Sequence, residues 1–152
     1  MRIKASGGHA SAPHRSSNAL EAAAAVVESL RGFPQGILGP LEPCALVPTI
    51  LRAGSASNVI PDSAEIWYGV RTFLLPDSRR AFHGALQRKV MAVLSAFPGI
   101  SATVEPIEGH PVLRNDVHMF SFAQEALRKA GCCAGSSACL PNWTDVFCRV
   151  AS

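Results

Sequence analysis

The chain has 152 residues, of which 48% are hydrophobic and 16% charged, and its net charge at pH 7 is +3. This length allows one domain with its own hydrophobic core, and the apolar content argues against intrinsic disorder. The basic residues are scattered rather than gathered in a stripe with aromatic residues, which argues against a nucleic-acid partner. No apolar run is long enough to cross a bilayer, so we expect no membrane association.

Four of the five cysteines lie near the C-terminus, at Cys132, Cys133, Cys139 and Cys148. A disulfide framework would spread them along the chain, so the clustering favours reduced thiols and a cytoplasmic protein. The first four residues also lack the apolar core of a signal peptide. Because the cysteine spacing fits no paired zinc-knuckle pattern, we predict no metal site here.

The first part of the chain predicts a strand, a helix and a second strand. A short strand is expected over residues 2–5. Asn18 should cap a helix that ends at Gly32, because Glu21 follows at the capping-box spacing. The apolar face of this helix is predicted from residues that recur every three or four positions: Leu20, Ala23, Ala24, Val27 and Leu30. After a loop rich in Pro and Gly, residues 44–53 predict a strand, in which Pro48 indicates an edge or a bulge.

A turn is expected over residues 54–62, followed by a strand over residues 64–71 with two different faces. Its second face carries Arg71 together with Glu65, Trp67 and Gly69. A second helix should begin at Pro76 and end before Gly99, with a buried side formed by Ala81, Leu86, Val90, Val93, Leu94 and Phe97. Residues 100–107 predict a further strand.

This order of elements predicts an α+β fold, a ferredoxin-like two-layer sandwich of the type strand-helix-strand-strand-helix-strand. Asp116 should then cap an extra C-terminal helix that runs through Ala130, with Met119, Phe120, Ala123 and Leu127 as its apolar positions. An irregular tail is expected after Gly131, because the chain becomes small and polar.

The loop at residues 7–14 is the strongest candidate for chemistry. His9 follows two glycines, which let the backbone approach a ligand closely, and histidine exchanges protons near neutral pH. The alternative is a solvated histidine in a surface loop. His14 fits a capping or surface position better than a ligand contact. The other histidines, His83, His110 and His118, are expected on surfaces and receive no role.

Two further residues can be interpreted in more than one way. Asn58 lies at a turn, where asparagine often serves the backbone alone, because it tolerates left-handed geometry. Arg71 fits either a cross-strand ion pair, with Glu65 as the nearest choice, or a clamp for a carboxylate, to which its planar fork is suited. The sequence contains no nucleophile, base and orienting group that can be matched, so the residues alone indicate a ligand-contacting domain rather than a complete catalyst.

Four segments in this order carry a resemblance to one family. Residues 8–14, 18–19, 57–62 and 69–73 read GHASAPH, NA, SNVIPD and GVRTF. They resemble the lid, or dimerisation, domain of the zinc-dependent amidohydrolases and peptidases, which include aminoacylases, acetylornithine deacetylases, succinyl-diaminopimelate desuccinylases, carboxypeptidase G and hippurate hydrolases. The resemblance runs from about Lys4 to Ala130. Residues 142–145 are similar to the point where such chains re-enter the catalytic domain.

The resemblance implies hydrolysis of an amide bond, in N-acyl amino acids, peptides or related amides, by a water held between two zinc ions. It implies that His9 reaches across a dimer and stabilises the developing oxyanion in the partner's site. Asn58 and Arg71 match residues that orient the substrate, typically through its carboxylate. Lids of this family pair through an edge strand and a helix, so the implied assembly is a homodimer.

The family's zinc ligands come mostly from an N-terminal catalytic half and from a histidine beyond the Trp-Thr-Asp region, and these 152 residues contain neither. We therefore expect this fragment-like chain to bind no cofactor and to be inactive alone, with a separate catalytic-domain chain as a further partner. The expected organisation is a lid domain over residues 1–110 and a partly disordered remnant of the second catalytic segment over residues 111–152.

Two other functions stay open on sequence grounds. An unpaired edge strand invites pairing, so the chain could be a stand-alone association module that dimerises without catalysis. The ferredoxin-like sandwich also serves as a nucleic-acid or small-ligand module, but the predicted strands lack the pair of exposed aromatic residues that stacks bases.

Overall fold

The structure is a computed structural model that describes residues 1–39, 41–107, 109, 112 and 116–131. It divides after Gly109, and the two parts are described separately. In the first part, four strands form an antiparallel sheet in the order β3-β5-β1-β6. Their bounds are β1 (Arg2–Lys4), β3 (Cys44–Ala53), β5 (Ser63–Thr72) and β6 (Ser101–Thr103).

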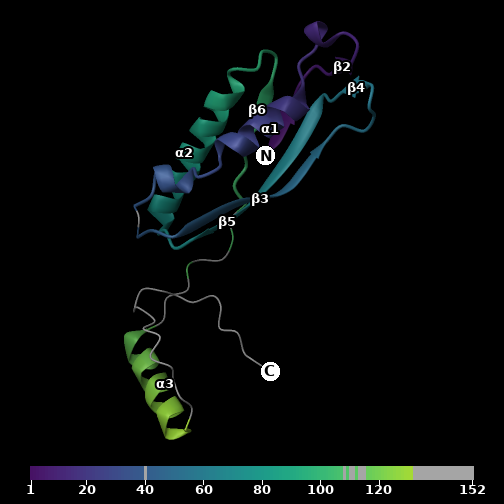
Figure 1. Ribbon diagram of the computed structural model, residues 1–152. Coiled ribbons are helices and arrows are strands. Elements are labelled where there is room, and N and C mark those ends of the chain that lie inside the picture. Colours follow the sequence, from purple (N-terminus) through teal and green to yellow (C-terminus); the bar gives the residue numbers. More distant parts are fainter. Residues whose placement is uncertain (40, 108, 110–111, 113–115, 132–152) are drawn as a thin grey trace. The chain divides into compact units, whose positions relative to one another are not determined.

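Two helices, α1 (Ala19–Ser29) and α2 (Pro76–Leu94), cover one face of this sheet (Figure 1). α1 packs against β1, β3 and β5, whereas α2 packs against α1 and β6. Two short 3₁₀ turns, η1 (Pro13–Arg15) and η2 (Pro34–Gly36), lie in the connections. The strand order and the single helical layer confirm the predicted ferredoxin-like α+β sandwich.

The hydrophobic core lies between the sheet and the helices. Ile3 and Ile66 of the central strands are fully buried, and they pack with Val26 of α1 and Val90 of α2. Phe82, on α2, is also buried, and its ring centroid lies 5.7 Å from that of Phe33. Neither α1 nor α2 lies on the opposite face of the sheet.

Helix α1 begins where the sequence predicts, and its predicted apolar face is confirmed in part. The Asn18 side chain accepts hydrogen bonds from the backbone N–H groups of Leu20 and Glu21, which confirms the predicted cap. Ala23 and Leu30 are buried and Val27 packs against the core, as predicted, whereas Leu20 and Ala24 are exposed. The buried face also includes Ala19, Ala22 and Val26, because a run of alanines is apolar all round and leaves the periodicity ambiguous.

The predicted buried face of helix α2 is also correct only in part. Leu86, Val90 and Leu94 are buried as predicted, but Phe82 takes the first buried position and Ala81 is exposed. The helix also ends three residues before Phe97, which is only partly buried. The larger aromatic side chain fills the space against Phe33, and this tertiary contact decides the register of the helix face.

Strand β3 is an edge strand with an irregularity at Pro48, so both predictions made from this proline are confirmed. Its register against β5 shifts between Pro48 and Ile50. Proline has no N–H to donate, which makes an edge or a bulge the place where it costs least. Among the described residues, no strand pairs with the outer edge of β3.

Two predicted boundaries differ from the structure. The segment expected as a turn over residues 54–62 contains the short strand β4 (Val59–Ile60), which pairs antiparallel with β2 (Gly8–His9). The strand expected over residues 100–107 is limited to β6, because only Ser101–Thr103 finds a partner in β1. Strands of two or three residues are too short for an alternating pattern to reveal.

The second part of the chain is described mainly through helix α3 (Val117–Lys129). The Asp116 side chain accepts hydrogen bonds from the N–H groups of His118 and Met119, at 2.9 and 3.0 Å, which confirms the predicted cap. The predicted tail and the cluster at Cys132, Cys133, Cys139 and Cys148 lie outside the described residues. Within those residues, no helix combines the length and apolar character needed to span a membrane.

Candidate functional site

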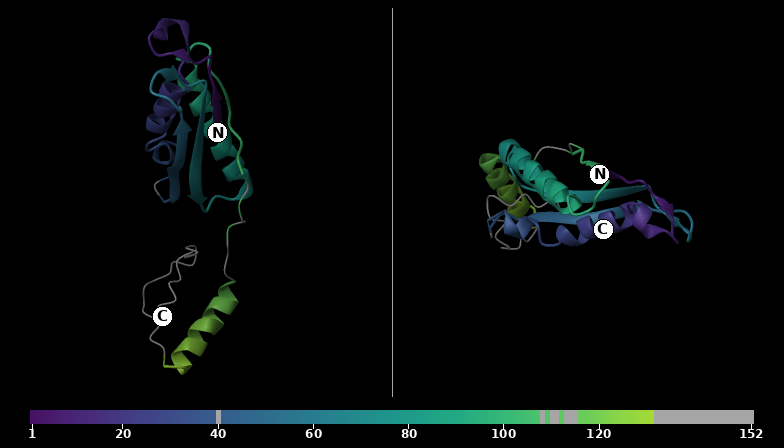
Figure 2. Two further views of the ribbon diagram at one scale, coloured as in Figure 1. Left: turned by 90° about the vertical axis from the view of Figure 1, so that its right-hand side faces the viewer. Right: turned by 90° about the horizontal axis from the view of Figure 1, so that it is seen from above.

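The candidate site stands on a two-stranded ribbon, formed by β2 and β4, at one end of the sandwich (Figures 1 and 2). Gly8 pairs with Ile60 and His9 pairs with Val59. The ribbon extends beyond the four-stranded sheet, so most of its side chains are exposed. Among them, Ile60 is buried at the base, whereas His9 is exposed.

Backbone hydrogen bonds tie the base of the ribbon to the sandwich. The N–H of Ala5 donates to the carbonyl of Asp62 at 2.7 Å, and that of Ala19 donates to the carbonyl of Pro61 at 3.1 Å. Ser6 and Ser17 exchange hydrogen bonds, because the N–H of each donates to the hydroxyl of the other at 2.8 Å. The start of β2 is therefore fixed to the start of α1.

Gly7 is packed closely against the backbone that leads into β5. Its φ is +61°, and a Cβ built there would lie 2.9 Å from both the Asp62 Cβ and the Ile60 carbonyl oxygen. L-residues disfavour that φ, and the space is filled as well. The two glycines of the motif thus serve the packing of the ribbon first, and they place His9 by doing so.

The His9 imidazole contacts Ser11 within its own loop. The Nδ1 atom lies 2.8 Å from the Ser11 hydroxyl oxygen, and the backbone N–H of Ser11 donates to Nδ1 at 3.2 Å. The loop itself is closed by the N–H of Ala12, which donates to the His9 carbonyl at 3.0 Å. His9 is therefore exposed but held, with its Nδ1 side turned to the protein.

An open hollow of about 620 Å³ lies beside His9. It is lined by ribbon residues and by the ends of β3 and β5, among them Gly8, Gly54, Pro61 and Asp62. Glycine and serine make up much of the lining, which leaves room for part of a ligand. By itself it offers no nucleophile and no base matched to His9.

The structure brings Asn58 next to His9, although 48 residues separate them in the sequence. The N–H of Ala10 donates to the Asn58 carbonyl at 2.9 Å, directly after the pairing of His9 with Val59. Both side chains are exposed at the same end of the ribbon. The two sequence motifs thus form one surface feature.

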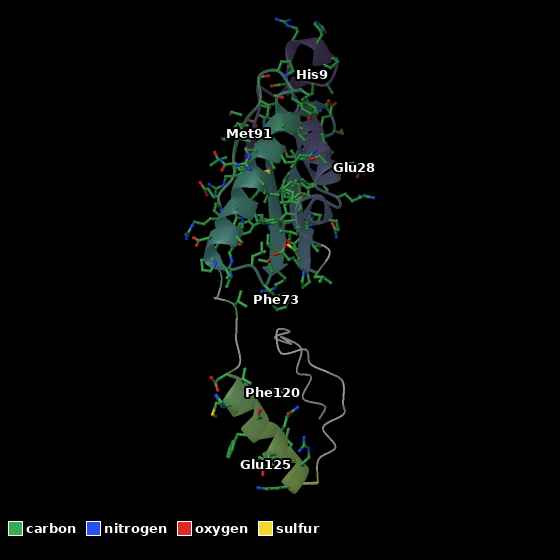
Figure 3. The ribbon with its side chains drawn as sticks, turned by 90° about the vertical axis from the view of Figure 1, so that its left-hand side faces the viewer. His9, Glu28, Phe73, Met91, Phe120 and Glu125 are labelled. Carbon is green, nitrogen blue, oxygen red and sulfur yellow. The ribbon has the colours of Figure 1, made fainter. Side chains whose placement is uncertain are left out.

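Arg71 lies elsewhere. It sits near the far end of β5, opposite Ala45 of β3, whereas the Ser63 end of β5 leads into the ribbon. At a rise of about 3.3 Å per residue, the strand separates the two ends by roughly 26 Å. Figure 3 shows the same separation, with His9 at one end of the domain and Phe73, two residues past Arg71, at the other.

The ion pair predicted as an alternative role for Arg71 is made by a different residue. Glu65 pairs with Arg52 of β3, at 3.4 Å, across the open face of the sheet. Within the described ranges, Arg71 makes no ion pair and its side chain is exposed. A carboxylate could therefore reach it from solvent.

The remaining histidines are spread through the fold. His14 is exposed in η1, and His118 is exposed on α3. His83 is half-buried on α2, where its ring packs edge-on against Phe82 at 6.0 Å between centroids. His110 lies outside the described residues. No group of three or more His, Cys, Asp or Glu side chains that could hold a metal occurs within the residues that are described.

Burial shifts the pKa of two titratable groups on the sheet. Burial raises the pKa of the Cys44 thiol, and a hydrogen bond with the Thr72 side chain offsets part of that rise. Burial likewise raises the pKa of the Tyr68 phenol, whose oxygen has no hydrogen-bond partner in the described part of the chain. A thiol with a raised pKa carries little thiolate at neutral pH, so Cys44 is a poor nucleophile.

Residues 1–97 match the family model described as a peptidase dimerisation domain. The chain is 30% identical over 129 residues to the N-acetylcysteine deacetylase of Bacillus subtilis, which covers 85% of this chain and 33% of the relative. It is 41% identical over 73 residues to the N-acyl-L-amino acid amidohydrolase of Geobacillus stearothermophilus, covering 48% of this chain and 20% of that protein. The chain thus spans a third or less of each relative's length.

Solved structures show the same fold. A protein of methicillin-resistant Staphylococcus aureus, classed as an aminohydrolase, superimposes with a TM-score of 0.72 at 25% identity, over 85% of this chain and 34% of that one. A dinuclear metal-binding peptidase from Bacillus subtilis superimposes with a TM-score of 0.56 at 21% identity, over 86% of this chain and 31% of its own.

The sandwich, its projecting ribbon and these likenesses define the dimerisation module of a peptidase or amidohydrolase. The chain belongs to the M20 family, and residues 1–97 are its dimerisation domain. The resemblance drawn from the four sequence segments is confirmed. The two-residue strands of the ribbon, and the contact of Ser11 with His9, were not predicted, and no periodic signal in the sequence could have revealed them.

Proposed function

We propose that this chain supplies the dimerisation domain of a metal-dependent amidohydrolase that acts on N-acyl amino acids, peptides or related amides. His9 donates a hydrogen bond to the developing oxyanion of a substrate held by another subunit. Asn58 and Arg71 orient the substrate, with Arg71 binding its carboxylate. The observation that carries the proposal is the juxtaposition of His9 and Asn58 on an exposed ribbon in a domain of this family.

The zinc chemistry implied by the family would polarise the amide carbonyl and activate water. The described residues hold no cluster for it, so its ligands belong to a catalytic domain outside this module. The relatives' length that this chain does not span has room for such a domain. We also propose a cytoplasmic location, which the clustering of four of the five cysteines near the C-terminus supports, because a disulfide framework would spread them along the chain.

The positions of His9 and Arg71 support a site shared between two copies. A strand of about 26 Å separates them within one chain, which is far longer than an N-acyl amino acid. Two β3 edges that pair antiparallel about a two-fold axis place the Ala53 end of one strand beside the Cys44 end of the other. His9 of one chain then lies on the same side as Arg71 of its partner.

Dimerisation is tested first. The proposed interface uses the open edge of β3 and the neighbouring helix α1, on which Leu20 is 42% exposed. The full chain should sediment as a dimer at micromolar concentration, and Leu20→Glu should convert it to a monomer, because a buried unpaired charge is costly.

Met91→Glu is the matched control and should remain a dimer. Met91 is 46% exposed on α2, and Figure 3 shows it on a different side from Glu28 of α1. A strict monomer in the unsubstituted chain contradicts the proposal.

The chemical roles are tested in a chimera. Residues 1–109 of this chain replace the matching segment of the Bacillus subtilis N-acetylcysteine deacetylase. His9→Gln should lower kcat by roughly a hundredfold or more, as expected for loss of one oxyanion donor. Arg71→Ala should mainly raise KM, by about tenfold, because a charge-assisted hydrogen bond is lost.

His14→Gln is the control in the same loop, and it should leave both constants unchanged. An active chimera in which His9→Gln has no effect overturns the proposed role of His9. The unmodified 152-residue chain, assayed alone with N-acetyl amino acids and zinc, should show no turnover. Two tightly bound zinc ions per chain together with turnover would instead show that it holds a complete site. A dimer that supports no active chimera would favour the alternative of an association module without catalysis.

A further inference from the structure

We infer that Ser11 is a positioning residue that fixes the neutral His9 ring as the Nε2–H tautomer, so that His9 acts as a hydrogen-bond donor and not as a base. The inference rests on the proposed role of His9 toward substrate, but its geometry stands on this chain's own atoms. It goes beyond that role because it names which nitrogen acts, and which neighbour selects it.

The backbone N–H of Ser11 determines which nitrogen of the His9 ring lacks a proton. That group can only donate, and it points to Nδ1 at 3.2 Å. Nδ1 must therefore be an acceptor, without a proton of its own. A neutral imidazole carries one proton, so the proton lies on Nε2.

The Ser11 hydroxyl strengthens the same choice. Its oxygen lies 2.8 Å from Nδ1, and with Nδ1 unprotonated the hydroxyl is the donor. Two donors from one residue thus converge on one nitrogen lone pair. Rotation of the ring about its χ torsions would break both contacts, so Ser11 fixes the orientation of the ring as well as its tautomer.

The consequence concerns the side of the ring turned away from Ser11. Nε2 presents an N–H there, which suits a developing negative charge on oxygen. A general base would need a free lone pair on that nitrogen, and the Ser11 contacts place the lone pair on the opposite side. The Ser11 contacts therefore make Nε2 of His9 a hydrogen-bond donor and not a general base.

The test is made on the full chain, labelled with ¹⁵N-histidine, at about pH 8.5, above the range in which imidazole titrates. Long-range ¹H–¹⁵N spectra report which ring nitrogen carries the proton. Signals of His9 are assigned as those missing from His9→Gln. We expect the two ring nitrogens of His9 to show the widely separated shifts of an unprotonated Nδ1 and a protonated Nε2.

Ser11→Ala removes the hydroxyl donor and should raise the population of the Nδ1–H form relative to Nε2–H by about fivefold, since one net hydrogen bond is lost. The two nitrogen shifts should move toward each other. Ser11→Thr keeps a hydroxyl and should restore the pattern of the unsubstituted chain. Ser16→Ala, at the serine that follows η1, should leave the His9 shifts unchanged. The backbone amide spectrum shows whether each variant is folded.

A protonated Nδ1 in the unsubstituted chain overturns the inference. Unchanged His9 shifts in folded Ser11→Ala, or a Ser11→Thr variant that matches Ser11→Ala, also overturn the part assigned to the hydroxyl. These outcomes are independent of catalysis. If His9→Gln left kcat of the chimera unchanged while the tautomer pattern was as expected, the proposed function would fail and the assignment of the ring would stand.

Discussion

The helix-covered face of the sheet and the β2–β4 ribbon are held in place by different interactions. The interface of the helices with the sheet is made of apolar side chains, with Phe82, Ile66 and Val90 buried almost completely. The ribbon buries only Ile60 and is held mainly by backbone hydrogen bonds and by the close approach of Gly7 to Asp62. Stability is concentrated in the first region, whereas the candidate chemistry stands on the second. Side-chain substitutions should therefore separate the two properties.

The strongest way to test this difference is to remove side chains from the interface. Phe82→Ala should lower the free energy of unfolding by about 3–5 kcal/mol, because it deletes a buried ring and leaves a cavity. Phe73→Ala is the matched control, since Phe73 is 38% exposed, and it should cost under about 1.5 kcal/mol. Denaturant titration measures both. Equal losses in the two variants would show that the core is not where the contacts place it.

A backbone substitution tests the ribbon. Gly7→Ala should cost about 1–3 kcal/mol, because alanine disfavours a φ of +61° and its Cβ would meet backbone and Asp62. Gly36→Ala is the control, because a Cβ there meets no atom within 4 Å, and it should stay within about 0.5 kcal/mol of the unsubstituted chain. A neutral Gly7→Ala would mean that the ribbon can shift freely against the sandwich.

The smallest expected effect is a dependence of folding stability on pH, which arises from a thiol on the sheet. Burial raises the pKa of Cys44, so the folded state keeps the thiol proton where the unfolded chain loses it. That contribution to stability is fully present below the usual thiol pKa of 9.0 and declines as pH rises above it. Cys44→Ala should flatten the decline in the midpoint of urea unfolding above pH 9, with little change at pH 7. An unchanged slope would contradict the assigned burial.

The sequence predicts the sandwich better than it predicts the ribbon, for a physical reason. Asn18 and Asp116 are caps with local hydrogen-bond partners, so they mark helix starts without tertiary information. The face that α1 buries depends on the sheet beneath it, and alanines on all sides hide the choice. Phe82 is buried through its contact with Phe33, from a distant loop, which periodicity cannot report.

In the candidate site, too, the sequence predicts some residues but not the tertiary contacts between them. His9 and Asn58 were selected from motifs, and the structure brings them together, but their pairing through β2 and β4 depends on contacts between segments 50 residues apart. The separation of Arg71 from Asn58 follows from the strand that the sequence predicts over residues 64–71, because Asn58 lies before this strand and Arg71 is its last residue. The distance of His9 from Arg71 could not be foreseen, since it depends on the pairing of β2 with β4. Ser11 was visible in the motif, and only the geometry of its N–H toward Nδ1 gives it a role.

The length of β5 has a genetic consequence for the proposed dimer. In the proposed dimer, each site takes His9 from one chain and Arg71 from the other. Within one chain, a substitution of His9 and a substitution of Arg71 therefore affect two different sites. A mixed pair, in which one chain lacks His9 and the other lacks Arg71, would carry both defects in one site and leave the second site intact. Two alleles that are each impaired alone would then complement each other when expressed together.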